Sequence, residues 1–236
     1  MPAVVGTLAH AGVGVTLFAF GVSVVIRSKT RSMEWKNKSE YTFLTIVGII
    51  QSLAPMPILI MPSICGNSNE CIQRNLIHMF CGLALLIGVL YSKAMHKSHQ
   101  FDFGIPLAGF ITAYFLTIHD HDVGSMDPLA MTNDFLHVFA SLCIMVASTL
   151  RAILDYYKSS VEIFFGVAIS SAGMVFFLMA PDITEAIVSG IGITGHVIGF
   201  SSVLFTLCLH LILYKIIHDG SNVRADRTEY DEVQIA

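Results

Sequence analysis

The amino-acid sequence predicts an all-α, polytopic membrane protein built as a seven-transmembrane-helix bundle. The chain has 236 residues, of which 54% are hydrophobic and only 13% are charged, and its mean hydropathy is +0.71. Soluble domains carry about twice that share of charged residues, which argues against a water-soluble fold. The formal net charge of −4 argues against a nucleic-acid partner. The lipid bilayer is therefore the partner that the composition indicates.

The chain is divided into apolar segments of membrane-spanning length. A helix that crosses the hydrocarbon core needs roughly 20 mostly apolar residues. The predicted spans are residues 4–26, 41–62, 72–92, 101–119, 129–150, 161–180 and 187–214. The first lacks the basic start of a signal peptide, so we interpret it as a retained span. The segment 215–236 is polar and lacks the apolar residues to pack alone. We therefore expect a transmembrane domain at 1–214 followed by a mobile cytoplasmic tail.

Basic residues predict the orientation of these spans. Of the 13 Lys and Arg residues, all except Arg74 fall in alternate connections or in the tail. Because cytoplasmic connections are rich in Lys and Arg, the N-terminus is predicted to be exoplasmic and the C-terminus cytoplasmic. Cys65 and Cys71 then share an exoplasmic connection, where a disulfide can persist. The predicted location is the plasma membrane or an endomembrane. A homo-oligomer and a cytoplasmic partner for the tail both remain open.

Histidines gather in the predicted exoplasmic half of the bundle. Four spans each carry one histidine six to nine residues from that end, which is roughly 9–14 Å below the surface. These are His10, His78, His137 and His196. The connection after the fourth span adds further polar residues, in the stretch "TIHDHDVGSMDPLAMTNDFLH". From it we select His119, His121, Asp127 and Asp134, the last of which precedes His137 by three residues and so shares its helix face.

This set of residues predicts a shared polar site. Ionisable side chains inside spans are costly and usually face the bundle interior or a water-filled cavity. Neutral imidazole is the commonest metal ligand and also binds haem iron, and carboxylates complete or orient such sites. Zinc or copper is the predicted cofactor, with haem as an alternative. Any one of these histidines, taken alone, is better interpreted as a hydrogen-bonded packing residue.

Several motifs resemble the transmembrane protein 45 family, a group of small seven-span proteins of largely unassigned activity. The matching residues are His10, Gly14 and Phe20-Gly21 in span one, His78 in "NLIHMF", His119-Asp120-His121 with Asp127, "GMVFFLMAP" closing at Pro181, and His196. The resemblance implies that these histidines form a set. The chain departs from the pattern after Asp127, where the family usually has a second His-x-His and only Asp134 and His137 are present here.

Three functions fit these residues. The first is a membrane protein that binds a metal ion or haem on its exoplasmic side, for metal handling, transport or redox. The second is a zinc-dependent membrane hydrolase, in which a bound water is activated by the metal. It ranks lower because no H-x-x-x-H pair occurs within a span, so the question of enzymatic activity stays open, with a non-enzymatic role favoured. The third is a structural or regulatory membrane protein without a cofactor, whose histidines would then point to unconnected places.

Overall fold

The computed structural model describes residues 2–27, 33–61, 63, 68–98, 103–118, 127–154 and 161–233, and within these ranges all regular structure is helical. Nine helices are formed there: α1 (Pro2–Arg27), α2 (Met33–Leu53), α3 (Met56–Ile60), α4 (Asn69–Ser98), α5 (Gly104–Ile118), α6 (Pro128–Leu154), α7 (Val161–Leu178), α8 (Pro181–Ile191) and α9 (Gly195–Val233). The predicted all-α class is confirmed.

The long helices have the length and composition of membrane spans. Six segments qualify: Thr7–Ile26, Ser39–Ile60, Cys71–Met95, Pro128–Ile153, Val161–Leu178 and Gly195–Ile217. Large apolar side chains cover their outer faces, and Ile87, Leu90 and Phe200 are each about two thirds exposed. Such surfaces suit lipid, so the chain is a multi-pass integral membrane protein. The apolar helix α5 has 15 described residues, which is roughly 22 Å against a hydrocarbon core of about 30 Å.

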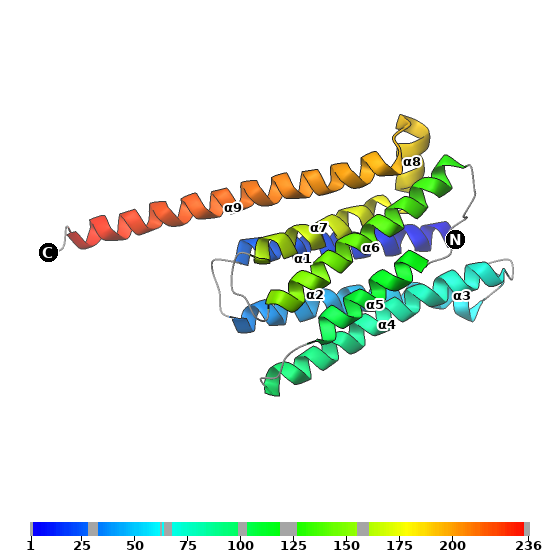
Figure 1. Ribbon diagram of the computed structural model, residues 1–236, viewed down its shortest axis with the longest axis horizontal. Coiled ribbons are helices and arrows are strands. Elements are labelled where there is room, and N and C mark those ends of the chain that lie inside the picture. The colour runs from blue at the N-terminus through cyan, green and yellow to red at the C-terminus, as the bar shows by residue number, and fades with distance from the viewer. Residues whose placement is uncertain are drawn as a thin grey trace.

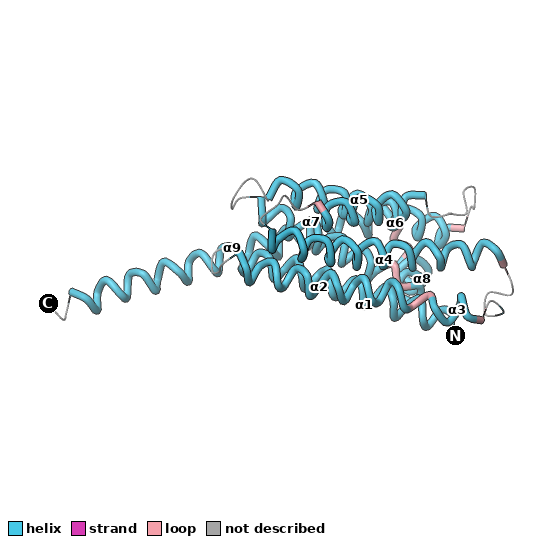
Figure 2. The backbone as a smooth tube through the Cα atoms, turned by 90° about the horizontal axis from the view of Figure 1, so that it is seen from below, coloured by secondary structure: helices cyan, strands magenta, loops and turns pink. Residues whose placement is uncertain are grey.

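Six helices form a closed ring. Contacts join α1 to α2, α2 to α4, α4 to α5, α5 to α6, α6 to α7, and α7 back to α1. Helix α9 lies outside this ring and packs along α7, α6 and α1, as the long orange and red helix of Figure 1 shows. Figure 2 shows the same bundle from below, with α9 extending past it toward the C-terminus. The interior of the protein is therefore the axis of the six-helix ring.

Glycines allow α1 and α7, the most extensive helix pair, to approach closely. A Cβ atom on Gly14 would lie 2.5 Å from the amide nitrogen of Phe177 and 2.7 Å from the carbonyl oxygen of Gly173. Seven residues later, a Cβ atom on Gly21 would overlap the carbonyl oxygen of Gly166. Backbone therefore packs on backbone along this contact, as is typical of small residues between membrane helices. We call these four glycines the α1–α7 glycine seam.

The second predicted span is interrupted by prolines. Helix α2 ends at Leu53, and the short helix α3 follows the turn at Ala54 and Pro55. Proline has no amide hydrogen, so Pro55 and Pro57 cannot donate to the carbonyl groups four residues earlier. The chain continues as helix after one turn, where the amides of Ile58 and Leu59 donate to the carbonyl oxygen of Pro55 at 3.0 and 3.1 Å.

The predicted span 187–214 is two helices in the structure. Helix α8 ends at Ile191, and Gly192 adopts a left-handed conformation with φ 73°. Glycine is the residue that takes this conformation without strain, and it commonly ends helices. Helix α9 begins only at Gly195 and continues to Val233, beyond the predicted start of the tail at residue 215. His196 is consequently in the first turn of α9.

A buried ion pair joins α2 to α6 at the end of the bundle opposite the N-terminus. Arg151 donates from Nε to Oε1 of Glu40 at 2.7 Å, and each residue is 6% exposed. Next to Glu40, the hydroxyl of Tyr41 donates to the carbonyl oxygen of Ser92 at 3.4 Å. Unpaired charges are costly at such depth, so each member of the pair requires the other.

The glycine seam predicts a strong effect from one added methyl group. We expect Gly14→Ala to destabilise the protein by about 1–3 kcal/mol, because backbone of α7 must move to admit it. Thermal unfolding of the purified protein in detergent measures this effect. Gly190→Ala is the matched control, since no atom lies within 4 Å of a Cβ at that helical position. Equal melting temperatures for the two variants would contradict close packing at the seam.

The ion pair predicts non-additive mutant stabilities. We expect Glu40→Leu to cost about 3–5 kcal/mol, because Arg151 is left charged in an apolar environment. The double variant Glu40→Leu/Arg151→Met should recover most of that loss, since two apolar side chains then pack together. Unfolding of all four proteins in the same detergent completes the cycle. Additive losses in the double variant would show that the two side chains act independently.

Candidate metal centre

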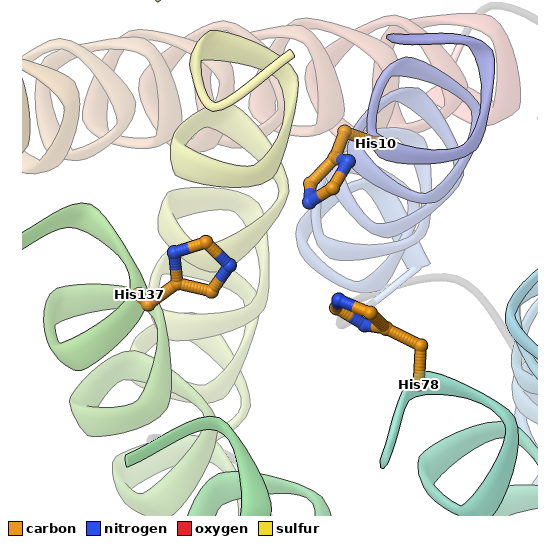
Figure 3. A group of neighbouring side chains, drawn as sticks. All are labelled: His10, His78 and His137. Atoms are coloured by element: carbon orange, nitrogen blue, oxygen red, sulfur yellow. The ribbon is translucent and has the colours of Figure 1, made fainter. Parts of the chain in front are cut away.

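Histidines from three helices meet inside the ring. His10 of α1, His78 of α4 and His137 of α6 each offer one ring nitrogen, and these three nitrogens lie within 4.8 Å of one another. The His10 ring meets the other two edge-on, with centroid distances of 5.8 Å to His78 and 6.1 Å to His137. Figure 3 shows the three side chains pointing into one shared space from three sides. We call this group the histidine triplet.

A hydrogen bond orients the most buried of the three rings. The Nδ1 atom of His137 lies 2.8 Å from the carbonyl oxygen of Asn133, one turn earlier in α6. Because a carbonyl oxygen can only accept, Nδ1 carries the proton of the neutral ring and Nε2 keeps the lone pair. Metal-bound histidines commonly show this arrangement, in which the second ring nitrogen donates to a carbonyl group. His137 is 3% exposed, so packing holds the ring as well.

The spacing of the triplet is close to that of a single coordination sphere. A tetrahedral zinc ion at about 2.0–2.1 Å from each nitrogen separates its ligands by about 3.3 Å. The separations of up to 4.8 Å need to shrink by at most about 1.5 Å, which small rotations about the side-chain torsions supply. Neutral imidazoles suit zinc and copper. Haem is a poorer fit. Its flat macrocycle needs space between two axial ligands, and three mutually adjacent histidines do not leave that space.

A cavity of about 370 Å³ lies against the triplet. Its polar lining includes Arg74 and Asn75 on α4 and Asn133 on α6, and its apolar lining includes Val13, Ile58, Phe176 and Met179. Space beside three ligands leaves a fourth position for water or a small ligand, as in catalytic and exchangeable metal sites. The guanidinium of Arg74 adds a positive charge, which favours an anionic ligand and opposes a second cation. We call this space the histidine cavity.

His196 lies apart from the triplet. It sits on α9, outside the six-helix ring, and its exposed ring packs on Phe135 with a centroid distance of 4.0 Å. The predicted depth of His196 in the membrane is similar to that of the three triplet histidines. Depth alone, however, does not determine whether a side chain faces the interior of the bundle. A Cβ atom on Gly195, one residue earlier, would lie 3.1 Å from the backbone of Thr132 on α6. The glycines of α9 therefore bring this helix to the outside of α6.

The predicted acidic residues and the remaining histidines have other positions. Asp127 is exposed and its carboxylate accepts a hydrogen bond from the amide of Leu129 at 3.2 Å, which caps the start of α6. Asp134 is partly buried and is not among the described residues that line the histidine cavity; the lining face of α6 carries Asn133 and His137. His119 and His121 lie outside the described residues.

Several residues at the cavity were not selected from the sequence as site residues. Arg74 and Asn75 lie one helical turn before His78, and Asn133 lies one turn before His137. Their spacing of three or four residues from a histidine places them on its helix face, and this signal could have identified them. Met179, which directly follows α7, was not selected either. It is 1% exposed and lines the cavity.

The first turn of α4 carries a disulfide-bonded cysteine beside the histidine cavity. Cys71 is disulfide-bonded, whereas Cys65, its predicted partner, lies outside the described residues. Cys71 lines the cavity, and its carbonyl oxygen accepts a hydrogen bond from the side-chain amide of Asn75 at 2.8 Å. The other three cysteines, Cys81, Cys143 and Cys208, have free thiols. A disulfide at this end suits the predicted exoplasmic side.

No protein-family model, no curated protein and no solved structure gives a significant match to this chain. The interpretation of the site therefore stands on its own geometry. That geometry consists of three convergent imidazoles, one of them held in a defined tautomer, beside a cavity of mixed polarity inside a membrane-embedded ring.

Proposed function

We propose that this protein is a metal-handling membrane protein, in which His10, His78 and His137 bind one transition-metal ion. The convergence of three ring nitrogens within 4.8 Å carries the proposal. Zinc is the preferred ion, because three imidazoles and one exchangeable ligand are a common zinc coordination set. Copper is the second choice, since imidazole also binds copper and the thioether of Met179 lines the same cavity.

The orientation of the protein is part of this proposal. Seven spans, counting α5 together with the six longer segments, give an exoplasmic N-terminus and a cytoplasmic C-terminus by the distribution of Lys and Arg. The histidine triplet then opens toward the exoplasmic side, from which metal would enter. Membership of the transmembrane protein 45 family is also proposed, on the resemblance carried by His10, His78 and the residues around them.

A cofactor-free structural role is a weaker account of the same residues. Burying several imidazoles in a membrane interior is costly unless they have a function or partners. Histidines that serve packing alone have no reason to converge from three helices that are separate in sequence. The histidine cavity beside them is a second feature that a purely structural bundle does not require.

A zinc hydrolase is the second candidate function, favoured by the cavity next to the triplet. A zinc ion held by the triplet would lower the pKa of a bound water toward about 7, which would allow that water to attack an ester or amide. The described lining of the cavity contains no carboxylate to act as general base, which is why metal handling ranks first. The test is hydrolysis of a fluorogenic lipid ester or amide by zinc-loaded protein. Activity that is lost in His137→Ala would favour the hydrolase over metal handling.

The triplet predicts the metal stoichiometry of the purified protein. We expect one equivalent of zinc per chain, measured by elemental analysis and by titration after chelation. His10→Ala, His78→Ala and His137→Ala should each weaken zinc binding by more than about 100-fold, because a lost ligand costs more than a lost outer hydrogen bond.

His196→Ala is the matched control for these variants. It removes an imidazole at the same predicted depth, but from outside the ring, and should leave zinc affinity unchanged. Zinc binding that depends on His196 as strongly as on His137, or wild-type protein that binds neither zinc nor copper, would refute the proposed function.

The proposed topology predicts the accessibility of the two termini. An epitope at the N-terminus should be labelled by antibody on intact cells or on sealed organelles of lumenal-side-out orientation. An epitope at the C-terminus should be labelled only after permeabilisation, because the basic connections hold that end in the cytoplasm. Labelling of both termini from the same side would require an even number of spans and would contradict the seven-span topology.

A further inference from the structure

A second cavity continues the histidine cavity along the ring axis. This central cavity has a volume of about 60 Å³ and takes lining residues from all six ring helices. One residue from each is Leu17, Leu44, Leu85, Thr112, Ser148 and Phe165. Gln51 and Phe176 line both cavities, so these two side chains lie between the two spaces. The end of the central cavity away from the histidines is lined by Arg151.

The residues that line the two cavities are spread over most of the thickness of a membrane. On α6, Asn133 lines the histidine cavity and Arg151 lines the central cavity, and five helical turns separate them, roughly 27 Å. On α2 the lining runs from Leu44 to Gln51 and continues beyond it to Ile58 of α3. The hydrocarbon core of a bilayer is about 30 Å thick. The lining residues of the two cavities therefore reach from near one face of the bundle to near the other.

Two buried polar atoms in the central cavity call for water. Gln51 is 7% exposed and Thr112 is 6% exposed, and neither Oε1 of Gln51 nor Oγ1 of Thr112 has a hydrogen-bond partner among the described residues. Buried polar atoms are nearly always hydrogen-bonded, to protein or to ordered water. A water needs roughly 10–15 Å³ of such space, so the cavity has room for about four waters. The hydroxyl of Ser148 and the guanidinium of Arg151 are further polar groups on its wall.

An ion pair lies at the far end of the path. Arg151, which lines the central cavity, is paired with Glu40 at 2.7 Å, and Glu40 lies at the start of the apolar segment Ser39–Ile60. Among the described residues, the titratable and charged groups at the two cavities are thus the histidine triplet and Arg74 at one end, and the Glu40–Arg151 pair at the other. Between them the path depends on neutral hydrogen-bonding groups, chiefly Gln51 and Thr112.

We propose that this axis is a proton path, in which waters held by Gln51 and Thr112 connect the histidine cavity to the Glu40–Arg151 pair. A proton moves along it by hopping: each water accepts a proton from one neighbour and gives another proton to the next. The net result is one proton transferred, with no change in oxidation state. A metal ion cannot follow, because it needs several oxygen or nitrogen ligands at once, which the largely apolar central cavity does not offer. The proposal does not depend on metal binding at the triplet.

Proton flux into vesicles tests this path. The full-length protein is reconstituted into liposomes loaded with potassium and a trapped pH-sensitive dye, and valinomycin then creates an interior-negative potential. Wild-type protein should acidify the interior faster than empty liposomes do. Gln51→Leu and Thr112→Val keep side-chain size but remove the groups that hold water, and each should reduce the flux to the level of empty liposomes.

Ser52→Ala is the matched control for this experiment. Ser52 neighbours Gln51 on α2 and is 8% exposed, and its hydroxyl also lacks a hydrogen-bond partner among the described residues. It lines neither cavity, so its variant should conduct like wild type.

Wild-type flux equal to that of empty liposomes, or equal flux in wild type and in both cavity variants, would overturn the proton path. Gel-filtration profiles show whether each variant is folded, and either cavity variant alone decides the question. Zinc content is measured on the same samples. Zinc binding without proton flux would refute the proton path and support the metal site. Proton flux without zinc binding would support the proton path and refute the metal site.

Discussion

The close contact between α1 and α7 is the constraint on which the rest of the structure depends. These helices are the first and the sixth of the ring, and their contact closes it. The glycine seam permits backbone contact at Gly14 and Gly173, which brings α7 close enough for Phe176 to contact His10, with a centroid distance of 6.4 Å. The walls of both cavities include residues from these two helices. Without this contact the histidines would face lipid or the partner helices would separate.

Much of this architecture follows from local patterns in the sequence. Apolar length predicts the spans, and the spacing of His10, His78 and His137 from the predicted exoplasmic end predicts that they share a level. The triplet confirms that these three residues come together. The sequence also contains the reason for the break at Pro55, since prolines cannot continue the backbone hydrogen bonds of a helix.

What local patterns did not predict was the arrangement of the helices around the axis. His196 has the expected residue type and a similar expected depth, but it belongs to the helix outside the ring. Depth is a property of one helix, whereas orientation toward the interior depends on contacts between helices that are distant in sequence. Gly192 could have indicated the separation of α8 from α9, because glycine commonly ends helices. Gln51 was also detectable, as a single amide in an otherwise apolar span.

The closure of the ring has a consequence for how the chain is made. Ser170 of α7 contacts the backbone of α1 at Phe18, across 152 positions of sequence. During synthesis the first helix must therefore wait in the membrane, with its glycine face unpaired, until the sixth ring helix has been inserted. Contacts of such long sequence separation form slowly. Once α7 arrives the ring is complete, and α9 joins an already assembled core from outside.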